Sequence, residues 1–566
     1  MDKIKILIMD KFNCSYDRVK FDEACVNVIS DDNENFNKWL YSLSMDCLLC
    51  PYKRIAQISN NISLKFSTIE TLKWRILNNN GSEEYVSSKI TSNIVCELML
   101  HLGQYGLYEL AVQNNNCNFK TIKNPTYPYT ELFITLGVII FILCGISAGR
   151  SFWHMITKCV TGVKDESNNK KLTKRRVKAL DTFRGASTLF MIFVNDGSGS
   201  YTVLEHTIWD GMLLGDIVFP CFIWIMGVCI PIALSAQLKR GVSKLQISYS
   251  ILKRSFLLFL IGVSLNTLGT DAQVENIRIF GVLQRFGVTY LVVGLVYLCF
   301  PSQQSKIFRN PSPTWIMRKM QDILSLLPHW FVMLILVIVH CALTFCLPVP
   351  GCPTGYLGPG GRHEDGKYFN CTGGATGYID KTVLTLNHIY HYPTSRSVYG
   401  SGPFDPEGIL GCLTAIFQVF LGVHAGTILM LYKDWKDRVM RWLLWAVFYA
   451  CLGCAFHFTN TIPINKNLWS LSFVFVTTSF SLAFLSGCYL LIDVAEVWRG
   501  GPFRIPGMNA LLLYVGHSVC YEIFPFHWRI GTMDSRALCL IESIWVVILW
   551  TIIAYIMHRK RTYITL

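Results

Sequence analysis

The sequence predicts a polytopic α-helical membrane protein with about eleven transmembrane helices and a small β-rich N-terminal domain on the luminal side. Of its 566 residues, 52% are hydrophobic and only 16% are charged, whereas soluble domains carry about 25% charged residues. Apolar runs of about 20 residues, the length that spans a bilayer, recur from residue 130 to the C-terminus. The first 128 residues contain no such run.

The N-terminal region, residues 1–128, is predicted to form a β-sandwich-like head. Stretches such as 62–66 and 107–112 alternate apolar and polar residues, which is typical of half-buried strands. Asn-X-Ser/Thr sequons, which are N-glycosylation acceptors, occur at Asn13, Asn61, Asn80 and Asn370. All of these lie in regions that other observations place in the lumen.

The 21 cysteines divide into a membrane set and two polar sets. Six lie in the first 120 residues and two in a later polar loop, and even counts fit disulfides in an oxidising compartment. The cysteines expected to form them include Cys47, Cys50, Cys96, Cys117, Cys352 and Cys371. The Cys47-x-x-Cys50 spacing also fits a redox or metal motif, but no His-rich partner accompanies it, and we expect no metal.

Residues 129–566 are predicted to form the transmembrane domain. The basic loop that ends at residue 178 follows the first span, so the positive-inside rule places the head in the lumen and this loop in the cytosol. An odd number of spans then puts the basic C-terminus, His558 to Arg561, in the cytosol as well. The predicted spans are 130–149, 183–197, 212–236, 251–267, 279–300, 329–347, 408–431, 441–458, 469–492, 507–524 and 539–557.

A polar connector between the second and third spans is the candidate functional site. Polar and ionisable groups this close to the hydrocarbon are costly and therefore indicate function, although Trp and Asp are also ordinary interface residues. The connector and its flanks carry Asn195, Asp196, His206, Trp209, Asp210 and Asp216. A long Gly/Pro-rich luminal loop, 350–406, is either a functional lid or a glycosylated cover.

Several function classes lack support. The net charge of +14 is spread over short clusters between apolar runs, as topology signals are, so we expect no nucleic-acid partner. The sequence shows no P-loop, G-x-S-x-G elbow or HExxH motif.

The motifs LDTFRG, FVNDGSGSY, HTIWDG and DIVFPCFIWIMG in 180–227 closely resemble the heparan-α-glucosaminide N-acetyltransferase family of lysosomal membrane enzymes. The resemblance continues through 277–290, 347–361, 405–411, 464–474, 506–517 and 524–528. It covers nearly everything from residue 130 onward, and the head more loosely. Asp196 and Asp210 stand where the family enzyme has Tyr and Asn.

The resemblance implies transfer of an acetyl group from cytosolic acetyl-CoA to the terminal glucosamine amine of heparan sulfate in the lysosomal lumen. His206 matches the family's catalytic histidine, and Asn195 belongs to the same site. His206 acts either as general base on the amine or as a nucleophile that carries the acetyl group. Asn195 is suited to hydrogen-bond the thioester oxygen, and Asp196, Trp209 and Asp210 are expected to contact the acceptor. Relatives suggest a homodimer.

Acetyl-CoA also needs a basic site for its phosphates. Topology places Arg184, Lys253 and Arg254 for this role, although plain positive-inside charge explains them nearly as well. Arg285 lies inside a span and is expected to pair with a buried acid or with the co-substrate. The alternatives are an acyltransferase with another sugar acceptor and a polytopic solute transporter, which would show an internal repeat.

Overall fold

The computed structural model divides the chain into two compact units. It describes residues 19, 21–30, 38–58, 62–79, 81–113, 116–161, 176–268, 273–300 and 320–564. The first unit comprises residues 1–45, 52–177 and 529–542. The second comprises residues 46–51, 178–528 and 543–566. The predicted sequons at Asn13, Asn61 and Asn80 lie outside the described residues.

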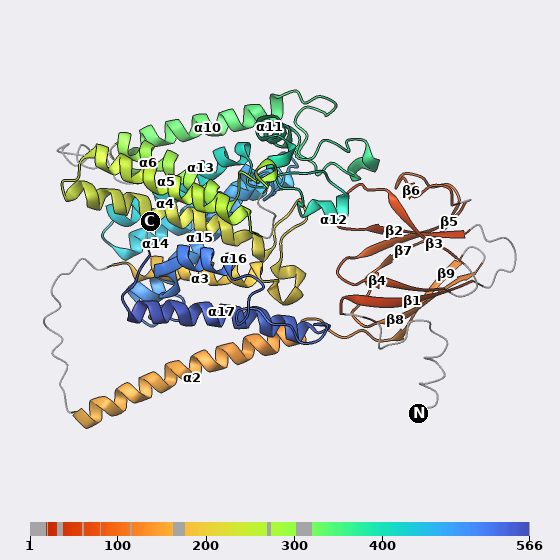
Figure 1. The fold of residues 1–566 in the computed structure, drawn as a ribbon, viewed down its shortest axis with the longest axis horizontal. Helices are drawn as coiled ribbons and strands as arrows, with labels where there is room; N and C mark the ends of the chain where they lie inside the picture. Colours follow the sequence, from red (N-terminus) through yellow and green to blue (C-terminus); the bar gives the residue numbers. More distant parts are fainter. Residues whose placement is uncertain are drawn as a thin grey trace. The chain divides into compact units, whose positions relative to one another are not determined.

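The first unit is built on a β-sandwich (Figure 1). One sheet has the order β4-β1-β8-β9 and the other the order β6-β3-β2-β5-β7. Val26 of β1, Leu40 of β2, Trp74 of β5 and Leu110 of β8 share one buried core, so both sheets contribute to it. The strands are β1 (Glu23–Ser30), β2 (Lys38–Ser44), β3 (Tyr52–Gln57), β4 (Ile62–Ser67), β5 (Leu72–Asn78), β6 (Tyr85–Val86), β7 (Ile94–Leu100), β8 (Leu107–Gln113) and β9 (Asn116–Lys123). The prediction of an N-terminal β-rich region is therefore confirmed.

The predicted cysteines form three disulfides. Cys96 of β7 bonds to Cys117 of β9, which links the two sheets. Cys47 bonds to Cys50, and Cys352 bonds to Cys371. The Cys47–Cys50 segment belongs to the second unit, where Leu48 N–H and the Asp46 carbonyl both hydrogen-bond the Tyr399 hydroxyl.

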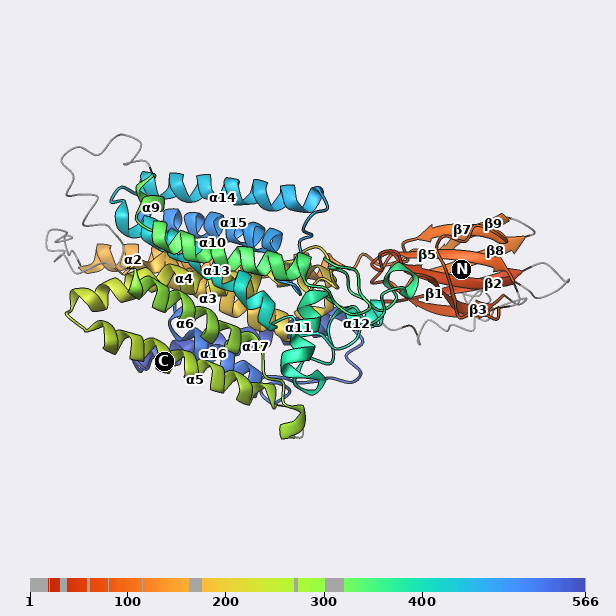
Figure 2. The same cartoon turned by 90° about the horizontal axis from the view of Figure 1, so that it is seen from above.

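The second unit is a bundle of long helices, most of them aligned in Figures 1 and 2. Its helices are α3 (Lys178–Asn195), α4 (Leu214–Lys239), α5 (Lys244–Asn266), α6 (Val282–Cys299), α9 (Gln321–Leu324), α10 (Leu327–Cys346), α11 (Ala375–Leu384), α12 (Ser395–Tyr399), α13 (Ile409–Leu431), α14 (Trp435–Phe458), α15 (Leu471–Tyr489), α16 (Ala510–Val519) and most of α17 (Arg536–Arg559). Helix α2 (Thr130–Thr161) belongs to the first unit.

Helix α13 lies at the centre of the bundle, because 89% of the residues in its most apolar stretch are buried. Its Gly422-x-x-x-Gly426 pair faces Gly227 of α4, and a Cβ on Gly422 would lie 2.2 Å from the Trp224 carbonyl oxygen. A Cβ on Gly227 would lie 2.0 Å from the Val419 carbonyl oxygen. Such small-residue pairs let two helix backbones approach closely in a membrane.

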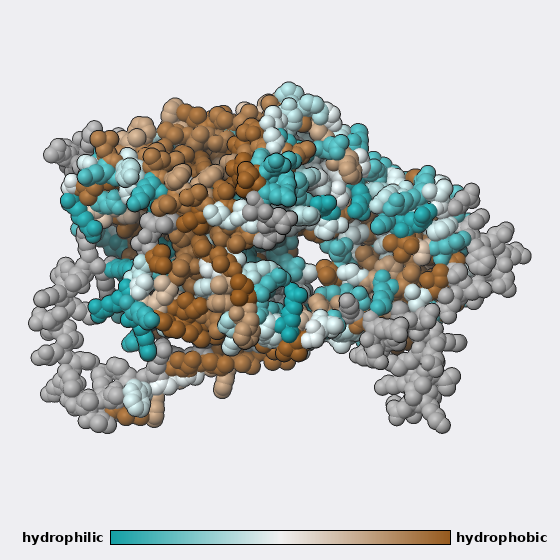
Figure 3. All heavy atoms as spheres, viewed as in Figure 1, coloured by the Kyte–Doolittle hydropathy of each residue, from teal (hydrophilic) through white to brown (hydrophobic). Residues whose placement is uncertain are grey.

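Eight helices within the described residues are long and apolar enough to cross a bilayer, so the polytopic prediction is confirmed. Figure 3 shows apolar side chains gathered along the bundle. The predicted span at 507–524 differs, because it forms a 3₁₀ turn at Pro506–Asn509 and the ten-residue α16. At 1.5 Å per residue, α16 covers only about half of the hydrocarbon thickness.

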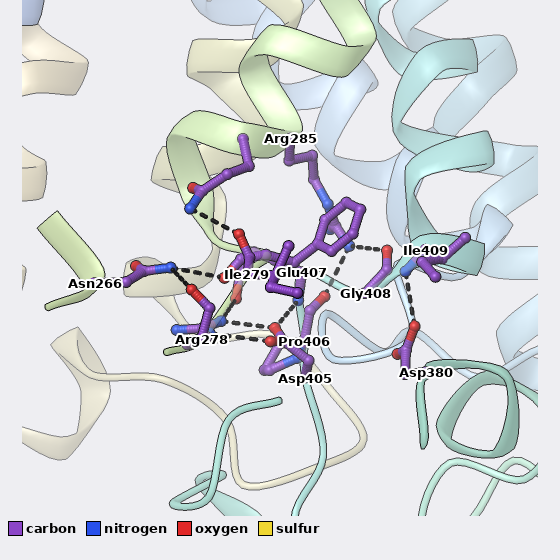
Figure 4. Close-up of polar contacts among 12 residues, drawn as sticks. Asn266, Arg278, Ile279, Arg285, Asp380, Asp405, Pro406, Glu407, Gly408 and Ile409 are labelled. Atoms are coloured by element: carbon purple, nitrogen blue, oxygen red, sulfur yellow. Dashed lines mark hydrogen bonds and ion pairs between the residues drawn. The ribbon is translucent and has the colours of Figure 1, made fainter. Parts of the chain in front are cut away.

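The long loop before α13, residues 350–406, is held by a cluster of charged side chains (Figure 4). Arg278 donates to Asp405 at 2.6 and 3.0 Å and to Glu407 at 2.6 Å. Burial alone lowers the pKa of Arg278, but the two carboxylates reverse that effect and raise it. Asp380 of α11 accepts the Ile409 backbone N–H at 2.9 Å, and burial raises the pKa of its carboxyl to about 7.

Candidate active site

His206 lies in a triangle of charged groups at the start of α4. Its Nδ1 is 3.0 Å from Oδ1 of Asp216 and 2.9 Å from Nζ of Lys466. Lys466 Nζ is also 3.2 Å from the same Asp216 oxygen. Asp216 is fully buried, whereas 36% of the His206 side chain is exposed. The imidazole is therefore held at Nδ1, while part of the ring remains exposed.

Asp216 is held by the backbone that surrounds it. Its Oδ2 accepts the backbone N–H and the hydroxyl of Thr207, at 3.1 and 2.8 Å, and the Leu213 N–H at 3.0 Å. The carboxylate sits in the first turn of α4, where the helix dipole favours negative charge. Three donors on Oδ2 leave Oδ1 for His206 and Lys466. The sequence placed Asp216 in the connector but assigned it no role.

The two neighbours of Nδ1 require different hydrogen-bonding roles of this nitrogen, because Asp216 accepts and Lys466 donates. A neutral imidazole carries its proton on one nitrogen, so Nδ1 either donates to Asp216 or accepts from the Lys466 ammonium. When Nδ1 donates, Nε2 has a free lone pair and is able to act as base or nucleophile. Within the described residues Nε2 makes no hydrogen bond.

Asn195 ends α3 and pairs with a histidine of α16. Its Nδ2 lies 3.0 Å from Nε2 of His517, and Nδ1 of His517 lies 3.3 Å from the Leu513 carbonyl oxygen. Because a carbonyl only accepts, Nδ1 of His517 carries the proton and Nε2 accepts from Asn195. The second amide proton of Asn195 remains for another acceptor.

The three residues predicted to contact the acceptor have different environments. Asp196 pairs with His527 at 3.5 Å. Trp209 is buried, and its indole N–H donates to the Leu357 carbonyl of the loop 350–406 at 3.0 Å. Asp210 accepts from Asn465 at 3.0 Å, and burial raises the pKa of its carboxyl. Only Asp210 among them is an exposed residue.

A cavity of about 320 Å³ lies among α3, α4, α5, α6 and α16. Its walls are mostly apolar, and they include both Arg184 and Arg254. Arg184 donates to the Gly507 carbonyl at 3.3 Å, and the guanidinium of Arg254 lies 4.7 Å from the Tyr290 ring centroid. Ile564 of the C-terminal tail also lines it, tethered by its backbone N–H to Asn509 at 3.1 Å.

One end of this cavity adjoins both polar pairs. Met191 is one turn before Asn195 on α3, and Tyr514 is one turn before His517 on α16. Phe219 is one turn beyond Asp216 on α4. One helical turn rises about 5.4 Å. The cavity therefore runs from the arginines to within about a turn of Asn195 and of the Asp216–His206 pair.

The other two predicted basic residues lie elsewhere. Within the part of the chain that the structure describes, neither Lys253, which is exposed, nor Arg285 lines the cavity. Arg285 is fully buried and donates to the carbonyls of Pro406 and Gly408, and its guanidinium lies over the Trp469 ring. It thus bonds backbone rather than a buried acid. Arg254 is the eleventh residue of α5, so it lies half-way along the helix rather than at its mouth.

Comparison with known proteins identifies the family. Residues 176–310 match the family model described as heparan-alpha-glucosaminide N-acetyltransferase, catalytic. The chain is 34% identical to the mouse (Mus musculus) heparan-alpha-glucosaminide N-acetyltransferase, over 96% of this chain and 89% of that protein. It is 35% identical to the human (Homo sapiens) protein, over 96% and 88% respectively.

The chain belongs to this family. It is therefore an acyltransferase, and its catalytic-domain match contains helices α3 to α6, which line the cavity, together with His206.

Lys466 and His517 contact His206 and Asn195 respectively, and the sequence alone assigned neither of them a role. Lys466 lies in 464–474 and His517 in 506–517, two of the stretches that carry the resemblance to the family. The signal was present as an ionisable residue beside a span. The contact between Lys466 and His206 could not be predicted from the sequence, because 260 residues separate them.

Proposed function

We propose that this protein transfers an acetyl group from cytosolic acetyl-CoA to the terminal glucosamine amine of heparan sulfate in the lysosomal lumen. The observation that carries the proposal is the cavity that leads from two arginines to the polar groups around His206. The mouse and human relatives are named for the same acceptor. The protein would be a lysosomal membrane enzyme, luminal at its head and cytosolic at its C-terminus, and a homodimer.

The cavity suits an acyl-CoA. Its apolar walls fit the pantetheine arm, and Arg184 and Arg254 supply fixed positive charge for phosphate groups. The basic residues His558 to Arg561 precede Ile564, which lines the same cavity. Acetyl-CoA is a co-substrate here and brings the activated acetyl group. No cluster of three or more metal-ligating side chains occurs among the residues the structure describes.

His206 acts through Nε2 by one of two reaction mechanisms. As general base, Nε2 removes the proton of the attacking amine while the new N–C bond forms and the C–S bond breaks, and the CoA thiolate leaves. As nucleophile, Nε2 bonds to the acetyl carbon while the C–S bond breaks and the thiolate leaves. The amine then attacks that carbon, the Nε2–C bond breaks, and the proton lost by the amine passes to the released Nε2. Asp216 holds the proton on Nδ1 in both mechanisms.

Asn195 would stabilise the oxygen on which negative charge develops. His517 takes one amide proton of Asn195 and so fixes the direction of the other. A positioned amide of this kind contributes roughly 3 kcal/mol to a comparable transition state.

The test is acetyl transfer from labelled acetyl-CoA to glucosamine by the full chain in membranes, with His206→Ala and a matched control, His391→Ala, in the luminal loop. We expect the His206 variant to lose transfer by at least 100-fold and the control to retain it, with acetyl-CoA binding unchanged in both. Transfer that survives in His206→Ala would contradict the role of this residue. Absence of transfer by the wild type would favour an acyltransferase with another sugar acceptor first, and a solute transporter second.

A further inference from the structure

A second cavity lies within the luminal loop itself, apart from the one described above. Its volume is also about 320 Å³, and the Cys352–Cys371 disulfide forms part of its wall. Lys367 and Lys381 line it together with Tyr368, Phe369 and Tyr378. No acidic residue is among the lining residues that the structure describes. The cavity is therefore positively charged, and a covalent bridge holds its shape.

The two lysines have different environments. Lys381 makes no hydrogen bond or ion pair within the described residues, and burial lowers the pKa of its ammonium group. Asp380, its neighbour in the chain, is fully buried and directs its carboxylate at the Ile409 N–H. Lys367 is exposed and lies 5.0 Å from the centroid of the Tyr368 ring, and the Tyr368 hydroxyl and Glu364 raise the pKa of its ammonium group. Lys381 is therefore a partly desolvated cation without a counter-charge, which costs free energy that an anionic ligand would recover.

The surroundings of the lysines favour a saccharide. Aromatic faces provide the apolar surface on which amphipathic ligands pack, and Tyr hydroxyls and backbone groups supply hydrogen bonds. Hydrogen bonds link this wall to the polar connector that contains His206. Gly373 N–H donates to the Gly358 carbonyl at 3.0 Å. The adjacent Leu357 carbonyl accepts from Trp209, three residues after His206.

We propose that this cavity binds a sulfate or carboxylate group of the acceptor glycan, on a sugar unit behind the terminal glucosamine. The proposal rests on the proposed function, and it names the part of the acceptor that a monosaccharide lacks. Lys367 and Lys381 would contact the anionic group, and the aromatic side chains would pack against the sugar ring.

The test compares two acceptors, free glucosamine and a sulfated heparan oligosaccharide that ends in glucosamine. Lys381→Gln and Lys367→Gln, alone and together, are measured beside Arg396→Gln, which removes a positive charge from the same loop outside the cavity. We expect the double variant to raise KM for the oligosaccharide about tenfold and to leave kcat and the glucosamine reaction unchanged. Free sulfate should inhibit only the oligosaccharide reaction of the wild type.

An unchanged KM for the oligosaccharide, or an equal rise for both acceptors, would overturn the proposal while leaving the acetyltransferase function intact. Failure of the wild type on both acceptors would instead reject the proposed function. Asn370 lines the same cavity and carries a sequon, so the comparison is repeated with Asn370→Gln. A lysine effect that exists only in that background would show that a glycan fills the cavity, and would also overturn the proposal.

Discussion

At the scale of single residues, the decisive feature is that His206 has two charged neighbours of opposite sign at nearly the same distance. Asp216 and Lys466 are themselves an ion pair, with Nζ 3.2 Å from Oδ1. Two unit charges about 3 Å apart interact by roughly 5 kcal/mol at an effective dielectric constant of 20. Removal of either charge therefore leaves the other without its counter-charge.

Replacement of Lys466 by Met should consequently destabilise the site. Without the ammonium, the buried Asp216 carboxylate has no cation beside it, so we expect a loss of roughly 3 kcal/mol in the free energy of unfolding and a fall in kcat/KM for glucosamine. Lys466→Arg keeps the charge and should keep both quantities close to those of the wild type. The measurements are thermal unfolding in detergent and acetyl transfer. Equal losses in the Met and Arg variants would show that Lys466 contributes packing rather than charge.

At the scale of one element, the start of α13 contains a buried titratable group. Asp380 accepts the first backbone N–H of this helix, and burial raises the pKa of its carboxyl to about 7 from its ordinary value of 3.8. The folded state therefore holds a proton on Asp380 that the unfolded chain releases. The resulting contribution to stability is full below about pH 4 and diminishes as pH rises through 7.

We expect the unfolding temperature of the wild type to fall more between pH 5 and 8 than that of Asp380→Asn. A shift of about three pKa units corresponds to roughly 4 kcal/mol at most, so several degrees should separate the two slopes. The measurement is thermal unfolding in detergent at a series of pH values. Parallel slopes for the two proteins would mean that Asp380 does not titrate in this interval.

The close crossing of α4 and α13 gives a second prediction at this scale. Gly422→Ala would place a Cβ 2.2 Å from the Trp224 carbonyl oxygen, so the helices must separate. We expect a loss of about 1–3 kcal/mol in the free energy of unfolding, as in other overpacked interiors. Gly487→Ala in α15 is the matched control, since a Cβ there would meet nothing within 4 Å. Equal stability of both variants would contradict this close packing.

Local patterns predicted most elements of this fold. The alternation in 62–66 and 107–112 became β4 and β8, and the long apolar runs became helices. The segment 507–524 misled because its hydropathy resembles that of a span, whereas Pro506 and the break after Val519 limit α16 to ten residues. Hydropathy measures composition, and it does not register where backbone hydrogen bonding ends.

At the scale of the whole molecule, the proposed function requires that the two substrates arrive from opposite sides of the membrane. In sealed vesicles with the head inside, acetyl-CoA added outside should acetylate glucosamine trapped within, and no acetyl-CoA should enter. Labelled N-acetylglucosamine recovered from the lumen is the measurement. Vesicles of the opposite orientation should be at least tenfold less active until permeabilised. Equal rates in both orientations would contradict the vectorial reaction.

The candidate site could be predicted from the sequence only in part, because its members come from distant segments. Asn195, His206 and Arg184 stand within one continuous stretch and were identifiable there. Lys466 and His517 reach it through the packing of the loop before α15 and of α16, which no local pattern encodes. The contacts of Arg285 could not be predicted for a related reason: its hydrogen-bond acceptors are backbone carbonyls, which have no signature in a sequence.

The segment 46–51 also has a consequence for biosynthesis. It belongs to the second unit, where Cys47 and Asp46 meet Val398 and Tyr399, partners that follow 351 and 353 residues later. At about 5–20 residues per second, a ribosome needs roughly 20 to 70 seconds to reach those partners. During that interval the segment waits, uncovered, in the compartment where the nascent chain is folding. A chaperone or thiol oxidoreductase that acts on this protein would find there a target that stays open until residue 399 has been made.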